Sequence, residues 1–402
     1  MLTFEQALSL VKEKVAGAGI APCPETLSLD QVRGRILAED VSADRDYPPF
    51  DRATRDGYAV RSLDVKATPV ELECVGEARA GKPYLGSVGE RTCAQIMTGA
   101  PLPRGADAVV MIEHVRAQGS RVEVLRAVGA GENVVRQGSE ARSGNLILRR
   151  GRRLAAAEMG LLASVGRTEI KVSRRPTVAI LPTGDEVVPA DQQPEWFQIR
   201  NSNAVALAAQ VESAGGIPRV LATAPDAIDD LRRRIKEGLE SDLLLLSGGV
   251  SAGKYDFVEQ VLGELGAEFY FQGVAIRPGK PLVFGRVGER FFFGLPGNPV
   301  STFVTFELFA RPAIEMLAGG EFAPPVFLRA RLGKVLRQST GLTTFMPARV
   351  VHEHADPVVN LVGWQGSGDL VGVAAANCLL VVHPEQTELA AGDWVDVMRI
   401  SD

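Results

Sequence analysis

Residues 243–256 read Leu-Leu-Leu-Leu-Ser-Gly-Gly-Val-Ser-Ala-Gly-Lys-Tyr-Asp, from Leu243 to Asp256. Four consecutive leucines predict a strand buried on both faces, as in a parallel sheet. The glycines that follow allow a sharp turn and leave backbone N–H groups uncovered by side chains. Apolar residues at helical spacing then run from Tyr255 to Leu265, so the glycines join the end of a strand to the start of a helix. Such junctions bind phosphates and other anions in open α/β sheets, because free N–H groups and the helix dipole point outward there.

The same loop has the glycine and lysine spacing of a phosphate-binding Walker A motif, with Gly248, Gly253 and Lys254 in register. The match ends at Tyr255, where that motif needs a Ser or Thr hydroxyl to hold magnesium. We therefore expect a phosphate-binding loop and disfavour a P-loop ATPase. The expected ligand-binding residues of the loop are Ser247, Gly248, Gly249, Ser251 and Lys254, and Asp256 is a candidate metal ligand.

Length and composition indicate the class of protein. A chain of 402 residues predicts two to four domains, and a net charge of −5 argues against general nucleic-acid binding. No run approaches the roughly 18 apolar residues of a membrane span, and the N-terminus lacks a signal-peptide pattern. The four cysteines include no CxxC pair, so neither a disulfide framework nor a zinc site is indicated. These features favour a cytoplasmic multidomain protein with neither nucleic acid nor membrane as a partner.

The chain around the loop alternates between predicted strands and helices. Strands are expected at 178–181, 220–222, 282–284 and 290–294. Asn201 or Ser202 caps one expected helix, and a long apolar helix is expected over 302–317. The alternation implies a doubly wound parallel sheet with right-handed crossovers. Three further polar loops, at 182–186, 275–281 and 295–301, should meet at its carboxyl edge.

The rest of the chain divides into smaller parts. Short alternating runs between 70 and 128, separated by Gly and Pro, predict a small inserted β domain, and similar runs after 326 predict a C-terminal β-barrel domain. The expected boundaries are 1–44 with 138–171 for an N-terminal linking domain, 45–137 for the inserted β domain, 172–320 for the α/β domain and 321–402 for the barrel.

The charged residues of these loops suggest a metal and an anion. Asp185, Glu186 and Asp256 could line one rim of the sheet, and magnesium prefers carboxylates together with phosphate oxygens and water. Lys254, Arg277 and Lys280 supply the opposing charge. A structural ion-pair network would use the same residues, so both interpretations stay open. No Ser-His-Asp arrangement or reactive cysteine is visible, which favours a site that binds and positions an anion electrostatically in a metal-assisted reaction.

A second group of polar residues lies in the N-terminal half. The proline-containing loop 46–60 carries Asp51 and Asp56, and the turn 97–103 carries Thr98. The two carboxylates could contact a metal or a polar ligand, and turn capping is an equally good explanation. Thr98 could contact a ligand, although a Thr before Gly is also ordinary turn chemistry.

Seven short stretches follow one another along nearly the whole chain. They are Pro49-Phe50-Asp51 through Asp56-Gly57-Tyr58-Ala59-Val60, Ile96-Met97-Thr98-Gly99-Ala100-Pro101, Gly138-Ser139-Glu140, Thr183-Gly184-Asp185-Glu186, Ser247-Gly248-Gly249-Val250-Ser251, Arg277-Pro278-Gly279-Lys280-Pro281, and Gly294-Leu295-Pro296-Gly297-Asn298-Pro299-Val300-Ser301. In this order and spacing, they together resemble the molybdopterin molybdenumtransferase family (the MoeA type and the E domain of gephyrin).

The resemblance implies an enzyme of molybdenum cofactor biosynthesis. Such enzymes take adenylyl-molybdopterin and molybdate, release AMP in a magnesium- or zinc-dependent step, and insert molybdenum into the dithiolene. The resemblance also implies a multidomain α/β plus β fold whose central α/β domain is MogA-like. It further implies a homodimer with an inter-subunit active cleft. Its expected protein partners are the molybdopterin adenylyltransferase and apo-molybdoenzymes.

The resemblance also assigns roles to individual residues. It implies Asp56, Thr98, Glu186 and Asp256 as the catalytic polar residues, with Asp56, Glu186 and Asp256 at the metal. The residues that it implies for substrate binding, beyond the loop above, are Arg277 and Lys280 for anions, Pro296 and Pro299 for the shape of the cleft, Ser367 as a contact, and Asp226 as the aspartate after the second strand.

Two departures from the family pattern concern charge. The family commonly has Asn-Ser-Ala-Met between the two aspartates, where this chain has Arg52-Ala53-Thr54-Arg55. The family's lysine before Pro-Gly-Lys is Arg277 here, which keeps the charge and changes its geometry. The sequence does not distinguish molybdate from tungstate as the substrate, and it identifies neither the working divalent metal nor the recipient apo-enzyme.

Two alternatives remain beside the insertase. The related molybdopterin adenylyltransferases share the α/β domain, but their loop reads Gly-Gly-Thr-Gly where this chain has Gly248-Gly249-Val250-Ser251. A non-enzymatic scaffold of the gephyrin kind is the other alternative. No long linker or additional binding domain supports it, and the intact motif carboxylates count against it.

Overall fold

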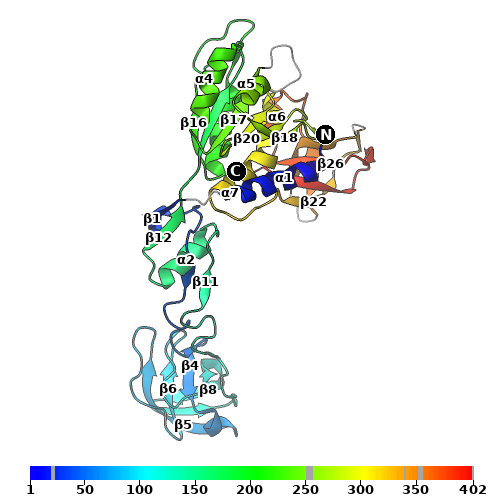
Figure 1. The fold of residues 1–402 in the computed structure, drawn as a ribbon. Coiled ribbons are helices and arrows are strands. Elements are labelled where there is room, and N and C mark those ends of the chain that lie inside the picture. The colour runs from blue at the N-terminus through cyan, green and yellow to red at the C-terminus, as the bar shows by residue number, and fades with distance from the viewer. Residues whose placement is uncertain (20–22, 250–256, 339–340, 352–355, 401–402) are drawn as a thin grey trace. The chain divides into compact units, whose positions relative to one another are not determined.

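The computed structural model describes residues 1–19, 23–249, 257–338, 341–351 and 356–400. They form two compact units (Figure 1). The first comprises Met1–Ala38, Gly151–Ala155 and Ile170–Asp402, and the second comprises Glu39–Arg150 and Ala156–Glu169. The bounds expected from the sequence for four domains are not tested by this division and remain a prediction.

The first unit contains a six-stranded sheet with β17 near its middle. The strands in spatial order are β16 (Ile217–Val220), β13 (Thr177–Pro182), β17 (Leu243–Ser247), β21 (Arg290–Leu295), β20 (Val283–Val287) and β18 (Glu268–Gln272). The first four strands are parallel, while β20 and β18 are antiparallel to their neighbours. The predicted parallel sheet is therefore confirmed for four strands, and an antiparallel edge that the sequence pattern did not indicate completes it.

The leucines of β17 supply two separate hydrophobic cores. Leu243 and Leu245 belong to one core, and Leu244 and Leu246 belong to the other, because successive side chains of a strand point to opposite faces. Helices cover both faces, as in a doubly wound fold. The first core includes residues of α1 (Phe4–Gly17), α3 (Ser202–Ser213), α6 (Pro299–Thr305) and α7 (Arg311–Leu317), and the second includes residues of α4 (Ile228–Gly238) and α5 (Val258–Glu264).

The helix expected over 302–317 is interrupted. A π-helical segment, Phe306–Ala310, separates α6 from α7. Pro312 has no N–H to donate to the preceding turn, and its ring would clash with the carbonyl group four residues earlier in a regular α-helix. The wider π turn accommodates the proline, so the prediction of one continuous α-helix was wrong.

A closed β-barrel forms the C-terminal part of the first unit. Its strands are β24 (Thr343–Val351), β25 (Val358–Leu361), β22 (Phe327–Leu332), β28 (Trp394–Arg399) and β26 (Cys378–Val382), in this order around the ring. Pairing of β26 with β24 closes the ring, which confirms the predicted barrel. The short strand β19 (Ile276–Arg277) pairs with β24 and so attaches the chain of the α/β region to the barrel.

The second unit contains another six-stranded sheet, which confirms the predicted small β domain. Its strands in spatial order are β7 (Ala108–Met111), β4 (Gly57–Val60), β6 (Thr92–Ile96), β5 (Val70–Ala78), β9 (Arg121–Val124) and β8 (Val115–Gln118). Gly57 begins the buried strand β4 so close to β7 that an added Cβ would lie 1.9 Å from the Val110 carbonyl oxygen. This close backbone contact fixes the position of Asp56, the residue before it.

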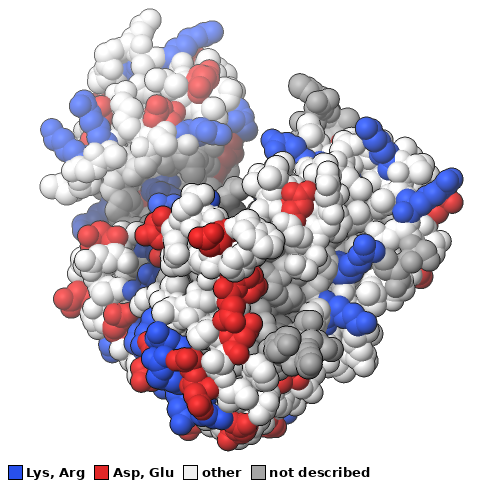
Figure 2. All heavy atoms as spheres, turned by 90° about the horizontal axis from the view of Figure 1, so that it is seen from above, with Lys and Arg blue, Asp and Glu red and all other residues white. Residues whose placement is uncertain are grey.

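Short two-stranded pairs and helix α2 (Ala156–Ser164) make up most of the remainder. The pairs are β1 (Pro24–Ser28) with β12 (Glu169–Ser173), β2 (Val41–Ser42) with β11 (Leu146–Leu148), β3 (Arg52–Ala53) with β10 (Val134–Val135), β14 (Val187–Val188) with β15 (Ile199–Arg200), and β23 (Leu336–Arg337) with β27 (Glu388–Leu389). None of the helices among the described residues has the length and apolar character needed to cross a membrane. On the face drawn in Figure 2, basic and acidic side chains are intermixed.

Candidate functional site

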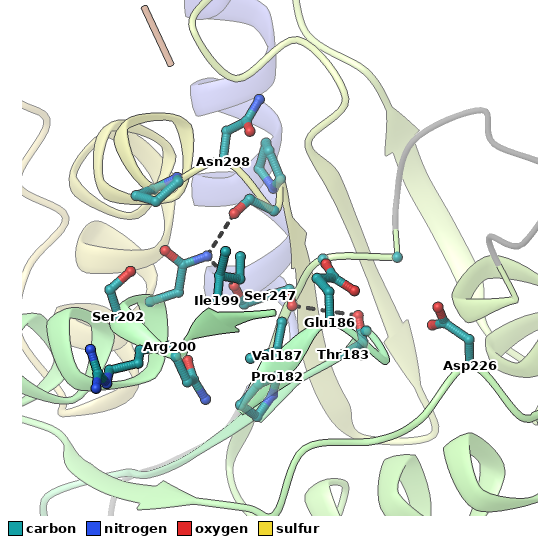
Figure 3. A pocket seen from close by; sticks show the side chains of 18 of the residues that line it. Pro182, Thr183, Glu186, Val187, Ile199, Arg200, Ser202, Asp226, Ser247 and Asn298 are labelled. Carbon is teal, nitrogen blue, oxygen red and sulfur yellow. Dashed lines mark hydrogen bonds between the residues drawn. The ribbon is translucent and has the colours of Figure 1, made fainter. Parts of the chain in front are cut away.

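A cavity of about 640 Å³ lies at the carboxyl edge of the parallel strands (Figure 3). The loops after β13, β17 and β21 contribute to it, as expected for the edge at which parallel strands end. The N-terminal turn of α3 supplies another part of the wall. Its polar or glycine lining residues include Thr183, Gly184, Glu186, Asn203, Asp226, Ser247, Gly248, Gly249, Gly297 and Asn298.

The loop after β17 turns on two glycines. Gly248 and Gly249 have φ values of +100° and +69°, which L side chains rarely adopt. A Cβ on Gly248 would lie 2.8 Å from the Thr183 hydroxyl oxygen, so the neighbouring loop also leaves no room for a side chain. The N–H of Gly248 donates to the Leu295 carbonyl oxygen at 3.1 Å, which ties the loop to β21. Ser247, Gly248 and Gly249 thus lie in the cavity wall, where the sequence placed them.

Three predicted residues of this loop, Ser251, Lys254 and Asp256, lie outside the described residues. Their proposed roles stay predictions.

Asn203 is a residue that the sequence analysis missed. Its side-chain amide donates to the Ser247 hydroxyl at 2.9 Å and to the Gly297 carbonyl oxygen at 2.8 Å. It therefore links the loops after β17 and β21. The neighbouring Asn201 is the helix N-cap, accepting from the Ala204 N–H at 3.0 Å, as predicted. An amide in the first turn of a helix that begins at the carboxyl edge was the available signal for Asn203.

Three acidic residues, Asp185, Glu186 and Asp226, lie in or beside the cavity wall. Glu186 and Asp226 both line it and are both labelled in Figure 3. Asp185 accepts a hydrogen bond from the Asp226 N–H at 3.1 Å. Partial removal from water, followed by the nearby charges of Asp185 and Glu186, raises the pKa of the Asp226 carboxyl. The three acidic groups are thus close enough to interact electrostatically.

Gly184 makes room for Glu186. Its φ is +124°, and an added Cβ would lie 2.5 Å from the Glu186 carboxylate oxygen Oε2. The glycine therefore permits both the turn and the position of the carboxylate above it.

The carboxylates fit a hard cation only with additional ligands. Among the described residues, no group of three or more His, Cys, Asp or Glu side chains is arranged to hold a metal ion. Glu186 and Asp226 nevertheless provide the oxygen ligands that magnesium prefers, and magnesium usually completes its shell with water and substrate phosphate oxygens. The donor set is compatible with such a shared cation.

The predicted cations Arg277 and Lys280 lie next to the cavity and do not line it. Both side chains are exposed, and neither forms an ion pair with any residue in the described part of the chain. Pro281, the neighbour of Lys280, is a lining residue. Between Arg277 and Lys280, Gly279 has a φ of +109°. A Cβ added to Gly279 would lie 2.4 Å from the Thr305 methyl carbon, so this turn packs tightly on α6.

Ser367 is connected to the cavity through Asn298. The Asn298 side-chain amide donates to the Ser367 hydroxyl at 2.9 Å, and the Val300 N–H donates to the Ser367 carbonyl oxygen at 2.9 Å. Pro296 and Pro299, on either side of Asn298, both line the cavity. Residues 363–369 with Val371 line a separate cavity of about 960 Å³, to which Ser367 itself belongs. The contact partner of Ser367 was not predictable from its sequence neighbours.

Asp56 and Thr98 meet in the second unit. The N–H and the hydroxyl of Thr98 both donate to Asp56 Oδ1, at 2.7 and 2.8 Å. The backbone N–H bond, followed by the hydroxyl bond, lowers the pKa of the Asp56 carboxyl. Because both bonds use Oδ1, the Oδ2 oxygen of this exposed carboxylate has no partner among the described residues and is available to another ligand.

The two unusual arginines beside Asp56 differ in their contacts. Arg52 pairs with Glu140 at 2.9 Å, whereas Arg55 is exposed and forms no ion pair with another described residue. Asp51 pairs with Arg136 at 2.6 Å and accepts the Gln137 N–H at 2.8 Å, which supports the structural interpretation of Asp51.

Comparisons with known proteins cover nearly the whole chain. Three family models match in order, described as "MoeA N-terminal region (domain I and II)" over residues 2–166, "Probable molybdopterin binding domain" over residues 179–316, and "MoeA C-terminal region (domain IV)" over residues 329–400.

Curated relatives and solved structures agree with these models. A molybdopterin molybdenumtransferase of Bacillus subtilis (strain 168) is 34% identical over 94% of this chain and 90% of the relative, and one of Staphylococcus aureus (strain COL) is 32% identical over 93% and 90%. The structure of the molybdopterin biosynthesis moeA protein from Pyrococcus horikoshii OT3 is similar with a TM-score of 0.80, at 28% identity and with 100% of both chains covered. The resemblance noted in the sequence is confirmed. The chain therefore belongs to the molybdopterin molybdenumtransferase family, a family of enzymes of molybdenum cofactor biosynthesis.

Proposed function

We propose that this chain is a molybdenum insertase that converts adenylyl-molybdopterin and molybdate into molybdenum cofactor and AMP. The observation that carries the proposal is the cavity at the sheet edge. It combines a side-chain-free glycine loop at Gly248 and Gly249 with carboxylates at Glu186 and Asp226. A glycine loop suits a phosphate, and carboxylates suit a cation bound to that phosphate.

In this proposal the phosphates of the substrate lie against the glycine loop. The Gly248 N–H is already bonded to the Leu295 carbonyl oxygen, whereas the Gly249 N–H makes no hydrogen bond with another described residue and faces the substrate in this proposal. Asn203 holds the loop in place through its bonds to Ser247 and Gly297. Lys254 would add positive charge to the same phosphates. Fixed donors of this kind bind charge without having to reorganise during the reaction.

Arg277 and Lys280 are the proposed binding groups for the molybdate oxyanion. Both are exposed and form no ion pair with the rest of the described chain, so their charges are available to a ligand. Ser367, which accepts a hydrogen bond from Asn298, would contribute a hydroxyl.

We propose magnesium, with zinc as the alternative, as the divalent cation, held by Glu186, Asp256 and Asp56 together with substrate oxygens. When bound, the cation would neutralise phosphate charge and so favour release of AMP. Asp226 keeps a raised pKa beside Glu186, and a cation there would favour its ionised form.

A homodimer with an inter-subunit cleft is the proposed assembly, with Asp56 and Thr98 belonging to the cleft. The support is the family resemblance of the two motifs and the available Oδ2 oxygen of Asp56. The proposed protein partners are a molybdopterin adenylyltransferase, which would supply the substrate, and apo-molybdoenzymes, which would receive the product.

The proposal is tested by incubating the purified chain with adenylyl-molybdopterin and magnesium, with and without molybdate, and measuring AMP and molybdenum cofactor. We expect both products to form together and to depend on molybdate. Formation of adenylyl-molybdopterin from ATP and molybdopterin, without molybdate-dependent AMP release, would instead identify an adenylyltransferase. A parallel series with tungstate measures the preference between the two oxyanions.

A further inference from the structure

A second cavity lies at the other end of helix α3. The N-terminal residues Ser202 and Asn203 line the first cavity, whereas Glu212 and Ser213 at the C-terminal end line the second. Because α3 has 12 residues, its ends are about 18 Å apart. The second cavity has a volume of about 240 Å³, and four arginines line it: Arg33, Arg35, Arg153 and Arg175.

Two of these arginines have carboxylate partners. Arg35 pairs with Glu25 and also donates to the Ser173 carbonyl oxygen at 2.8 Å. Arg153 pairs with Glu315 at 3.3 Å. Their charges are therefore partly neutralised within the protein.

The other two arginines form no ion pair with any residue that the structure describes. Arg175 donates from Nε to the Gly215 carbonyl oxygen at 3.1 Å and from an Nη nitrogen to the Gly216 carbonyl oxygen. These carbonyl groups follow the end of α3, so Arg175 already offsets the partial negative charge of that helix end. A Cβ on Gly215 would lie 3.6 Å from an Nη nitrogen of Arg153, so the guanidinium groups of Arg153 and Arg175 converge at this residue. Arg33 is exposed at the same cavity.

A serine also contributes a hydroxyl to the wall of the second cavity. Ser173 is only 4% exposed and lines the second cavity, and its hydroxyl makes no hydrogen bond with another described residue. The hydroxyl is therefore available to a ligand in this cavity. Glu212 is the one carboxylate among the described lining residues. Four guanidinium groups therefore line the cavity, and the carboxylates at or paired to them are three: Glu212 in the wall, Glu25 and Glu315, so positive charge is in excess.

We propose that the second cavity binds a tetrahedral oxyanion of the phosphate class, held by Arg33, Arg153 and Arg175 with a hydrogen bond from the Ser173 hydroxyl. Guanidinium groups bind phosphate oxygens in pairs, and each arginine here keeps N–H groups beyond those already used. The site is separate from the first cavity and does not depend on the function proposed for it.

The test is isothermal titration calorimetry of the full chain with inorganic phosphate at constant ionic strength. We expect saturable binding that Arg33→Gln weakens by about fivefold, because one cation near the ligand is lost. Glu212→Gln should tighten binding by about the same factor, since it removes the opposing carboxylate of the wall. Neither side chain makes an ion pair with a described residue, so both variants should melt at the wild-type temperature. Lys236→Gln removes an exposed charge on α4 in the same unit and should leave the affinity unchanged.

Absence of saturable binding by both inorganic phosphate and glycerol 3-phosphate would overturn the proposal, whereas binding of either supports it and shows whether the ester is tolerated. Equal effects of Arg33→Gln and Lys236→Gln would show only general charge attraction and would also overturn it. Loss of affinity in Lys280→Gln without a change in Arg33→Gln would place the phosphate at the first cavity, which contradicts the proposal.

Discussion

At the scale of single residues, the hydrogen bonds to Asp56 determine its charge state. The Thr98 N–H contributes the largest lowering of the Asp56 pKa, and the Thr98 hydroxyl contributes the next. Thr98→Ala should therefore raise the pKa of Asp56 while leaving it below its ordinary value, because the backbone bond remains. Thr98→Ser keeps the hydroxyl and is the matched control. Carbon-13 NMR titration of the carboxyl measures this, and an Asp56 pKa unchanged in Thr98→Ala would contradict the assignment.

The same pair has a predictable effect on stability. A carboxyl with a lowered pKa in the folded state stabilises the protein above the pKa of the unfolded chain, and this contribution is lost as pH falls through the folded-state pKa. The stability difference between wild type and Thr98→Ala should therefore shrink as Asp56 becomes protonated. Denaturant unfolding on both sides of the titration checks the sign, and a difference that grows on acidification would contradict it.

The pKa of Asp226 is raised, in contrast to that of Asp56, and the nearby charge of Glu186 is one of the causes. Removal from water is the main cause of its raised pKa, and the charges of Asp185 and Glu186 add to it. Glu186→Gln should lower the Asp226 pKa part of the way to its ordinary value, while Glu195→Gln, at an exposed position outside the cavity wall, should not. Because the folded state holds this proton more tightly than the unfolded chain, stability decreases as pH rises through the raised pKa. The measurement is the same NMR titration, and equal Asp226 pKa values in the two variants would show that Glu186 is too distant to act on it.

At the scale of loops and helices, two glycines make a matched pair. Gly184 has a φ of +124° and an added Cβ would lie 2.5 Å from Glu186, whereas Gly263 in α5 has no atom within 4 Å of an added Cβ. Gly184→Ala should lower the free energy of unfolding by about 1–3 kcal/mol. Gly263→Ala should raise it by about 0.5–1 kcal/mol, because alanine favours the helix. Urea unfolding decides between them, and a neutral Gly184→Ala would show that the loop relaxes without strain.

Much of the α/β region was predictable because its patterns are local. The run Leu243–Leu246 predicted a strand buried on both faces, and its side chains do alternate between two cores. The π-helical segment Phe306–Ala310 was not predicted, since the apolar spacing around it is that of a regular helix and only Pro312 signals a break. The antiparallel edge was missed for a similar reason: short apolar runs do not reveal the direction in which strands pair.

At the scale of the whole molecule, the meeting of distant loops was predictable only where topology determines it. Parallel strands end at one edge, so Glu186, Gly248 and Pro296 were expected together, and all three line one cavity. The bond between Asn298 and Ser367 depends on how the C-terminal part packs on the α/β region, which no short motif encodes. Asn203 was missed because its role becomes visible only when the loops that it joins are side by side.

The proposed insertase reaction at the sheet edge is tested most directly by molybdate-dependent AMP release in two variants. Glu186→Gln removes a carboxylate from the cavity wall, and Glu195→Gln removes one from an exposed position outside it. We predict that Glu186→Gln reduces the rate of AMP release by about 10²-fold or more, the typical effect of losing a charged group that stabilises the transition state. Glu195→Gln should react at the wild-type rate. Wild-type rates of AMP release in both variants would contradict the account.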